Sequence, residues 1–138
     1  MDTILDYKPA GFFRRIAALF YDLILIIALC IGSILLITFF INTEILSPFM
    51  YLFFLVLSIS FYCYFWKQNN GQTLGMQVWK IKLSQIDGAD VKLSNMIARC
   101  ISGLVLNLFF GINYLPMIFR KDKRTLNDIL SKTVLKKI

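Results

Sequence analysis

A carboxylate inside an apolar stretch is the strongest chemical signal in this sequence. From residue 16 to residue 65 the chain has no lysine or arginine, and Asp22 and Glu44 are its only charged residues. A carboxylate near the centre of a bilayer costs about 2.5–3.5 kcal/mol on insertion scales, so it usually faces a partner, a cavity or a pathway. Three interpretations of Asp22 stay open: a structural ion pair, a role in ion or proton transport, and solvation at the membrane interface.

Candidate partners for Asp22 come from distant parts of the chain. Arg15 precedes it by seven residues, about 10 Å along a helix axis, which is too far for direct pairing. We therefore expect Asp22 to pair with Arg99 or with Arg124. Asp128 follows Arg124 by four residues, the spacing that brings opposite charges together on a helix. These five residues form the predicted polar cluster on the cytoplasmic side.

The elements that must position these charges are membrane helices. The 138 residues are 58% hydrophobic, against roughly 45–50% in ordinary globular proteins. A soluble domain of this size could not bury so much apolar surface, so lipid is expected to cover the surplus. We expect an all-α integral membrane protein with one domain over residues 1–138. Its spans are predicted at about 16–41 and 48–66, with a third hydrophobic segment at about 97–119.

The positions of the basic residues predict the orientation of the first two spans. Lysine and arginine are enriched in cytoplasmic segments next to membrane helices. Arg14 and Arg15 precede the first span and four lysines lie in the loop 67–95, whereas the loop 42–47 has no basic residue. We therefore expect the N-terminus and the loop 67–95 to be cytoplasmic and the loop 42–47 to lie outside.

The third hydrophobic segment, 97–119, decides the side of the tail. The tail 120–138 is strongly basic and has an amphipathic pattern, so it is expected to remain cytoplasmic. It does so only if the third segment re-enters the membrane instead of crossing it. Gly111 and Pro116 break the helical pattern there and favour re-entry. A full third span is the alternative.

The cytoplasmic loop 67–95 is expected to contain structure of its own. Residues 79–84 alternate between apolar and polar, residues 87–88 are an Asp-Gly turn signal, and residues 91–94 alternate again. This pattern predicts a short β-hairpin. An interfacial helix over residues 74–81 is the competing interpretation.

Several kinds of chemistry are absent from the composition. There is no histidine, and the cysteines Cys30, Cys63 and Cys100 are far apart in apolar segments. Triad hydrolysis and histidine-ligated zinc are therefore excluded, and we expect no metal, no cofactor and no enzymatic activity. The net charge of +7 lies outside the apolar segments. Because it is separated from them, it predicts contact with anionic lipids at the cytoplasmic face and not with nucleic acid.

Three motifs occur in order along nearly the whole chain. The first runs from Ala10 to Asp22 and reads Ala-Gly-Phe-Phe-Arg-Arg-Ile-Ala-Ala-Leu-Phe-Tyr-Asp. The second is Gly71-Gln-Thr73-Leu-Gly75, and the third is Arg124-x-Leu-x-Asp128-x-x-Ser-x-Thr133. Together they resemble the RDD family of bacterial membrane proteins, which is named for one arginine and two aspartates.

The resemblance implies a role for particular residues. The family's arginine corresponds to Arg15 and its two aspartates to Asp22 and Asp128, while Gly71, Thr73 and Gly75 correspond to the loop that follows the second helix. Two positions depart from the pattern: Met76 stands where a basic residue often occurs, and Asn127 where histidine is common. The first departure weakens any anionic contact that this loop would make.

The functional expectation is a multi-pass protein of the bacterial cytoplasmic (inner) membrane with its N-terminus inside. The resemblance implies that it takes part in transport of an ion or small solute through the Arg/Asp cluster. Two or three helices are too few to enclose a pathway, so we expect a homo-oligomer or a membrane-protein partner. The alternative is an interaction or assembly protein whose Arg/Asp pairs are structural.

Overall fold

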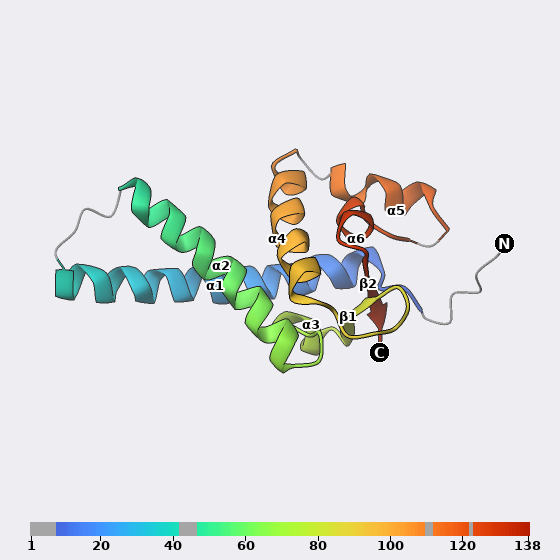
Figure 1. Ribbon diagram of the computed structural model, residues 1–138, viewed down its shortest axis with the longest axis horizontal. Coiled ribbons are helices and arrows are strands. Elements are labelled where there is room, and N and C mark those ends of the chain that lie inside the picture. Colours follow the sequence, from blue (N-terminus) through green and yellow to red (C-terminus); the bar gives the residue numbers. More distant parts are fainter. Residues whose placement is uncertain (1–7, 42–46, 110–111, 122) are drawn as a thin grey trace.

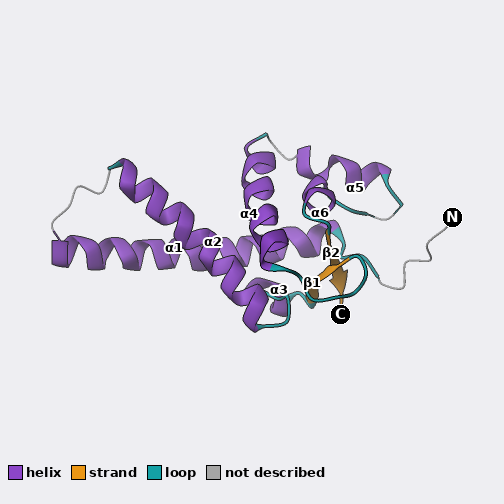
Figure 2. Cartoon of the chain, viewed as in Figure 1, coloured by secondary structure: helices purple, strands orange, loops and turns teal. Residues whose placement is uncertain are grey.

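The computed structural model describes residues 8–41, 47–109, 112–121 and 123–138. Two long helices extend away from a compact cap of shorter elements (Figure 1). The long helices are α1 (Phe12–Ile41) and α2 (Pro48–Gln68). The cap comprises α3 (Leu74–Val78), β1 (Ile81–Gln85), α4 (Leu93–Leu108), η1 (Ile112–Tyr114), α5 (Leu115–Phe119), α6 (Leu126–Leu130) and β2 (Thr133–Lys137). Most of the described chain is helical, and β1 and β2 form its two-stranded sheet (Figure 2).

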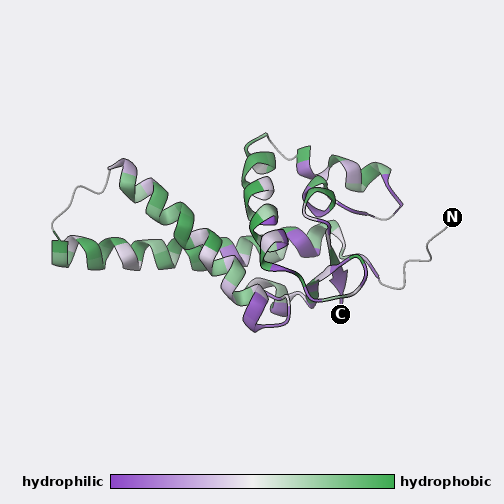
Figure 3. Cartoon of the chain, in the orientation of Figure 1, coloured by the Kyte–Doolittle hydropathy of each residue, from purple (hydrophilic) through white to green (hydrophobic). Residues whose placement is uncertain are grey.

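The two long helices are long and apolar enough to cross a membrane. Their most apolar windows are only 6% buried within the protein. Soluble monomers rarely expose contiguous apolar faces of this size, so these helices indicate a membrane-type protein. Apolar residues fill α1 and α2, whereas polar residues gather toward α3 and the sheet (Figure 3). The prediction of two helices long and apolar enough to span a membrane is thus confirmed, and the first begins four residues earlier than its predicted span.

The third hydrophobic segment is divided into pieces. α4 has 16 residues, about 24 Å of helix, which is shorter than the roughly 30 Å hydrocarbon core. In Figure 1, α4 runs across the direction of α1 and not along it. Gly111, where we predicted a break, lies outside the described residues. Pro116 lies in the first turn of α5, where backbone amides have no hydrogen-bond partner within the helix, so its missing N–H costs no helix hydrogen bond.

The predicted strand is present, but its predicted partner is wrong. β1 pairs antiparallel with β2 of the tail, in a register that joins Leu83 to Leu135. Gly88 does form a turn, with a φ of 81°, but Leu93 begins α4 and does not continue a hairpin. α3 spans Leu74–Val78, so the competing helical interpretation is correct for these five residues and wrong for Ile81, which begins β1.

The N-terminal segment lies along the tail strand. The amide of Ala10 donates to the carbonyl of Leu135 at 2.8 Å, and the amide of Lys137 donates to the carbonyl of Lys8 at 2.8 Å. The amphipathic pattern of the tail is therefore divided between two elements: among the tail's described residues, Leu126–Leu130 form α6, and Val134 belongs to β2. The apolar sides of β1 and β2 are buried because they pack together with Met76 and Trp66.

A disulfide cross-link tests the packing of α2 against α4. Cys63 of α2 and Cys100 of α4 both pack against the same core, where α2 and α4 are in contact. Mild oxidation of the purified protein should therefore join these two cysteines and leave Cys30 free. Alkylation followed by mass spectrometry should then label one cysteine per chain. Labelling of all three after oxidation would contradict this packing.

Candidate functional site

The site is built around a carboxylate in the tail, Asp128, which is fully buried. α6 begins with a capping box. The Asp128 amide donates to the Thr125 hydroxyl at 3.2 Å, and the Thr125 amide donates to the Asp128 carboxylate at 3.2 Å. This exchange satisfies amides at the helix start that have no carbonyl partner within the helix. It also fixes the direction in which the Asp128 carboxylate points.

Two arginines from different helices hold this carboxylate. Nη1 of Arg15, from α1, lies 2.6 Å from Oδ2 of Asp128, and Nη1 of Arg99, from α4, lies 2.6 Å from Oδ1. Arg15 also donates through Nε to the Ala10 carbonyl at 3.0 Å and through Nη2 to the Lys123 carbonyl at 3.3 Å. Charge-assisted bonds of this kind are about twice as strong as neutral ones. They join α1, α4 and α6.

Burial alone would raise the pKa of Asp128, but the two guanidinium groups outweigh it. Arg99 first and then Arg15 favour the ionised form, and their hydrogen bonds add to this, so the pKa lies below its ordinary value. Because the pKa of Asp128 is lower in the folded than in the unfolded state, its ionisation stabilises the fold at pH values above the ordinary carboxyl pKa. This stabilisation is lost as the pH falls through the folded-state pKa.

Asp22 is not in an ion pair with any described residue, and the predicted pairing with Arg99 or Arg124 is wrong. Its Oδ2 accepts a hydrogen bond from the Thr73 hydroxyl at 2.5 Å, and its Oδ1 accepts one from the Gly75 amide at 2.9 Å. Asp22 is almost fully buried. Asp22 therefore joins α1 to the start of α3. Arg99 forms its ion pair with Asp128.

Each residue of the loop motif has a definite place. Gly71 has a φ of 85°, and a Cβ there would lie 2.3 Å from the Leu83 carbonyl oxygen. Thr73 caps α3, because its oxygen accepts a hydrogen bond from the Met76 amide at 3.2 Å. A Cβ on Gly75 would lie 2.3 Å from the Ala18 carbonyl oxygen. The motif thus allows α3 to approach the backbone of α1.

Arg124 does not form the predicted helical pair with Asp128. α6 begins at Leu126, after the capping residue Thr125, so Arg124 precedes the helix. The i,i+4 spacing brings charges together only when both residues are helical. The ion pairs of Asp128 are made by Arg15 and Arg99.

Several polar contacts of the site were not predicted from the sequence, although Thr133 and Asn127 lie within the third motif. The Thr133 hydroxyl accepts a second bond from Arg99 Nη1 at 2.8 Å. Asn113 accepts from the Asn127 amide at 2.9 Å, and the Ser102 hydroxyl donates to the Asn127 side chain at 2.5 Å. The sequence offered one usable signal, the spacing of Thr125 and Asp128, which is that of a capping box with aspartate at its third position.

A cavity of about 550 Å³ lies among α1, α2, α4 and the cap. Arg15, Asp22 and Arg99 are in its lining, together with Tyr62 and Trp66 of α2. The remaining lining is mostly apolar. A concave, mainly apolar space with a few polar groups has the character of a ligand site. Among the described residues, no group of three or more histidine, cysteine, aspartate or glutamate side chains is placed to hold a metal ion.

The fold and site define a class: a mostly helical membrane-type protein with two apolar helices and buried Arg/Asp pairs. The sequence profile described as the RDD family matches residues 9–132, so the chain belongs to this family. It is 32% identical over 133 residues to the uncharacterised protein YckC of Bacillus subtilis (strain 168). That alignment covers 92% of this chain and 83% of YckC. No solved structure matches the chain.

Proposed function

We propose that this chain is a multi-pass protein of the bacterial cytoplasmic membrane that takes part in moving an ion or small solute, which binds in the cavity. The observation that carries the proposal is the cavity of about 550 Å³, with Arg15, Asp22 and Arg99 in its lining. In this proposal the ion pairs of Asp128 shape the site, and they carry out no bond-making chemistry. The protein is accordingly proposed not to be an enzyme.

Backbone hydrogen bonds support a topology with two crossings. β2 bonds to β1 of the loop 67–95 and also to the segment that precedes α1. Segments joined in this way must lie on the same side of the membrane. An even number of crossings then separates the N-terminus from the tail. α1 and α2 supply two, and α4 with 16 residues and α5 with 5 residues are too short to add two more. By the distribution of lysine and arginine, that shared side is the cytoplasm.

Cysteine labelling tests this topology. In a cysteine-free background, an impermeant thiol reagent added from outside should label Thr43→Cys and leave Lys137→Cys unlabelled. Thr43 falls in the predicted outside loop 42–47, of which residues 42–46 lie outside the described residues. Permeabilised cells should label both, which controls for reactivity. External labelling of Lys137→Cys would require a third crossing.

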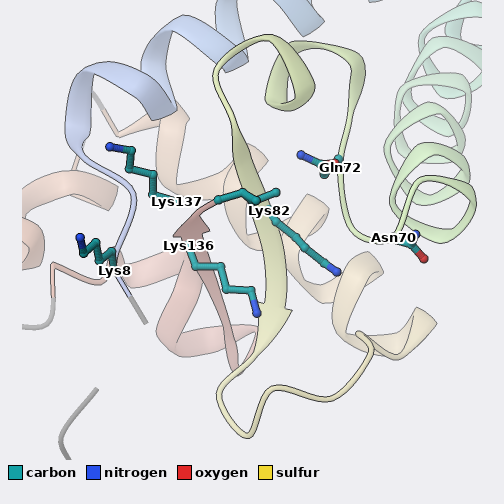
Figure 4. A pocket seen from close by; sticks show the side chains of 7 residues that line it. Lys8, Asn70, Gln72, Lys82, Lys136 and Lys137 are labelled. Carbon is teal, nitrogen blue, oxygen red and sulfur yellow. The ribbon is translucent and has the colours of Figure 1, made fainter. Parts of the chain in front are cut away.

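A basic surface on the cap supports contact with anionic lipid headgroups. Lys8, Lys82, Lys136 and Lys137 line a shallow depression beside the sheet. Their amines spread apart instead of converging on one point (Figure 4). A dispersed arrangement suits the diffuse charge of a lipid surface, where each lysine contributes about 1 kcal/mol.

An assembly role is the second candidate, and the structure of Asp22 favours it at one point. Both carboxylate oxygens of Asp22 accept hydrogen bonds, one from the hydroxyl of Thr73, the N-cap residue of α3, and one from the Gly75 amide of α3. This arrangement is structural and leaves the carboxylate less available to a passing cation. Two membrane helices are also too few to enclose a pathway. Transport therefore implies a homo-oligomer or a partner membrane protein.

Flux in proteoliposomes tests the transport proposal. The probes are gradients of protons, Na⁺, K⁺ and small carboxylates. Ser58 of α2 lines the cavity, and its hydroxyl bonds only to its own helix, at the Phe54 carbonyl. Ser58→Phe should fill the cavity and abolish flux of the solute that the unmodified protein moves.

A matched control is available on α1. The Ser33 hydroxyl likewise bonds to its own helix, at the Leu29 carbonyl, but Ser33 is not part of the cavity lining. Ser33→Phe should keep normal flux. Equal flux in both variants would remove the cavity from the mechanism. Absence of flux for every probe, with a stable oligomer in detergent, would favour assembly.

A further inference from the structure

Part of the cavity lining is apolar and exposed at the surface of the protein. Leu19, Leu104 and Leu108 line it, yet they are 43%, 52% and 73% exposed. Leu19 lies on α1, which is apolar enough to span a membrane, and Leu104 and Leu108 lie on the shorter apolar helix α4. An occupant can therefore enter from the bilayer with an apolar chain in contact with these leucines.

Asp22 lines the cavity and Asp128 pairs with two arginines of the lining, and both carboxylates are already supplied with donors. Oδ1 and Oδ2 of Asp128 accept from Arg99 and Arg15. The two oxygens of Asp22 accept from Thr73 and Gly75. Arg15, Arg99, Asp22 and Asp128 balance in formal charge, but their carboxylates offer little further binding capacity to a cation.

Several hydrogen-bond donors on residues that line the cavity have no acceptor among the described residues. Arg99 makes its bonds through Nη1, and its Nε and Nη2 have no acceptor among the described residues. Nε1 of Trp66 is buried without a hydrogen-bond partner in the described part of the chain. Tyr62 and Tyr114 also line this cavity, and neither hydroxyl makes a hydrogen bond to a described residue. A buried donor without an acceptor is costly, so Trp66 Nε1 favours a ligand that supplies an acceptor, and the other donors lie in the same lining to bind it.

We propose that the cavity binds an amphiphilic anion, a carboxylate or phosphate headgroup carrying an apolar chain. The headgroup lies at Arg99, Trp66 and the two tyrosine hydroxyls, and the chain passes between Leu19 and Leu104 to the bilayer. A charged acceptor is favoured because its hydrogen bonds with a guanidinium are about twice as strong as neutral ones. This inference rests on the proposed use of the cavity as a binding site, but it does not require transport.

Trp66 allows a direct test, because it lines the cavity and is buried. Trp79→Phe leaves Trp66 as the chain's single tryptophan, since the sequence has two. This protein is placed in phosphatidylcholine nanodiscs that contain a small, equal fraction of one brominated probe. The probes are brominated phosphatidylglycerol, brominated fatty acid and brominated phosphatidylcholine. We expect one or both anionic probes to quench Trp66 fluorescence more than brominated phosphatidylcholine does.

The two anionic probes separate the sources of the headgroup. Excess quenching by phosphatidylglycerol alone assigns the site to a bilayer phospholipid, and by fatty acid alone to a free carboxylate. Excess quenching by both supports the shared chemistry. Equal quenching by all three probes would overturn the inference even if Ser58→Phe still abolished flux. The inference and the transport proposal can therefore fail separately.

Hydroxyl-deleting variants test the headgroup position without breaking an ion pair. Tyr62→Phe and Tyr114→Phe each remove one donor, which should weaken binding of the anionic probe about fivefold per lost bond. Tyr64→Phe is the matched control, because Tyr64 is on α2, exposed and absent from the lining. An unchanged preference for the anion in the Tyr62→Phe, Tyr114→Phe double variant would contradict the proposed headgroup position.

Discussion

Replacing Asp128 with asparagine should destabilise this protein more than any other single loss of charge. The substitution keeps the shape of the side chain but leaves Arg15 and Arg99 buried without a counter-charge. Breaking a buried ion pair from one side costs about 3–5 kcal/mol. We expect Asp128→Asn to lower the melting temperature in detergent markedly and to reduce the yield of folded protein.

The matched control for this prediction is Asp87→Asn, in the exposed turn before α4. Substitutions at exposed positions usually change stability by less than about 0.5 kcal/mol. Melting temperatures that fall equally in the two variants would contradict the central role of Asp128. Since its arginines lower the pKa of Asp128, the carboxylate is ionised at neutral pH in the Asp87→Asn control. The difference in melting temperature between Asp128→Asn and Asp87→Asn should therefore be largest at neutral pH. It should shrink as the pH falls below the ordinary carboxyl pKa.

The second large effect is expected for Gly75→Ala. The new methyl group would lie 2.3 Å from the Ala18 carbonyl oxygen and 2.9 Å from Oδ1 of Asp22. The first contact is with helix backbone, which cannot rotate away, so α3 must separate from α1. Overpacking typically costs about 1–3 kcal/mol, and here the hydrogen bond from the Gly75 amide to Asp22 is weakened as well.

Gly32→Ala is the control, because a Cβ at Gly32 of α1 meets nothing within 4 Å. Alanine is favoured over glycine within a helix by roughly 0.8–1.0 kcal/mol in water, so this variant should be at least as stable as the unmodified protein. The measurement is thermal unfolding of both variants in the same detergent. If Gly75→Ala melts together with Gly32→Ala, the close approach of α3 to α1 does not contribute to stability.

Features that depend on local sequence were predicted well. A long charge-free run defines a membrane helix by itself, because the length of helix needed to cross lipid is set by the bilayer. This is why α1 and α2 lie close to their predicted bounds. The alternation that became β1 and the Asp-Gly turn after it are equally local. The resemblance of the motifs to the RDD family also needed only the order of residues along the chain.

The partners of those elements were decided by the tertiary structure. A period of two indicates a strand but carries no information about its neighbour, so β1 pairs with a strand some fifty residues away and not with the next segment. The partners of the charged side chains were likewise decided by the tertiary structure. Asp22, Arg99 and Asp128 were all identified from the sequence, but which of them meet depends on how α3, α4 and α6 pack on α1. In the folded protein Asp22 accepts a hydrogen bond from the Gly75 amide of α3, and Arg15 and Arg99 both pair with Asp128. A buried charge is stabilised by groups within hydrogen-bond distance in space, whatever their separation along the chain.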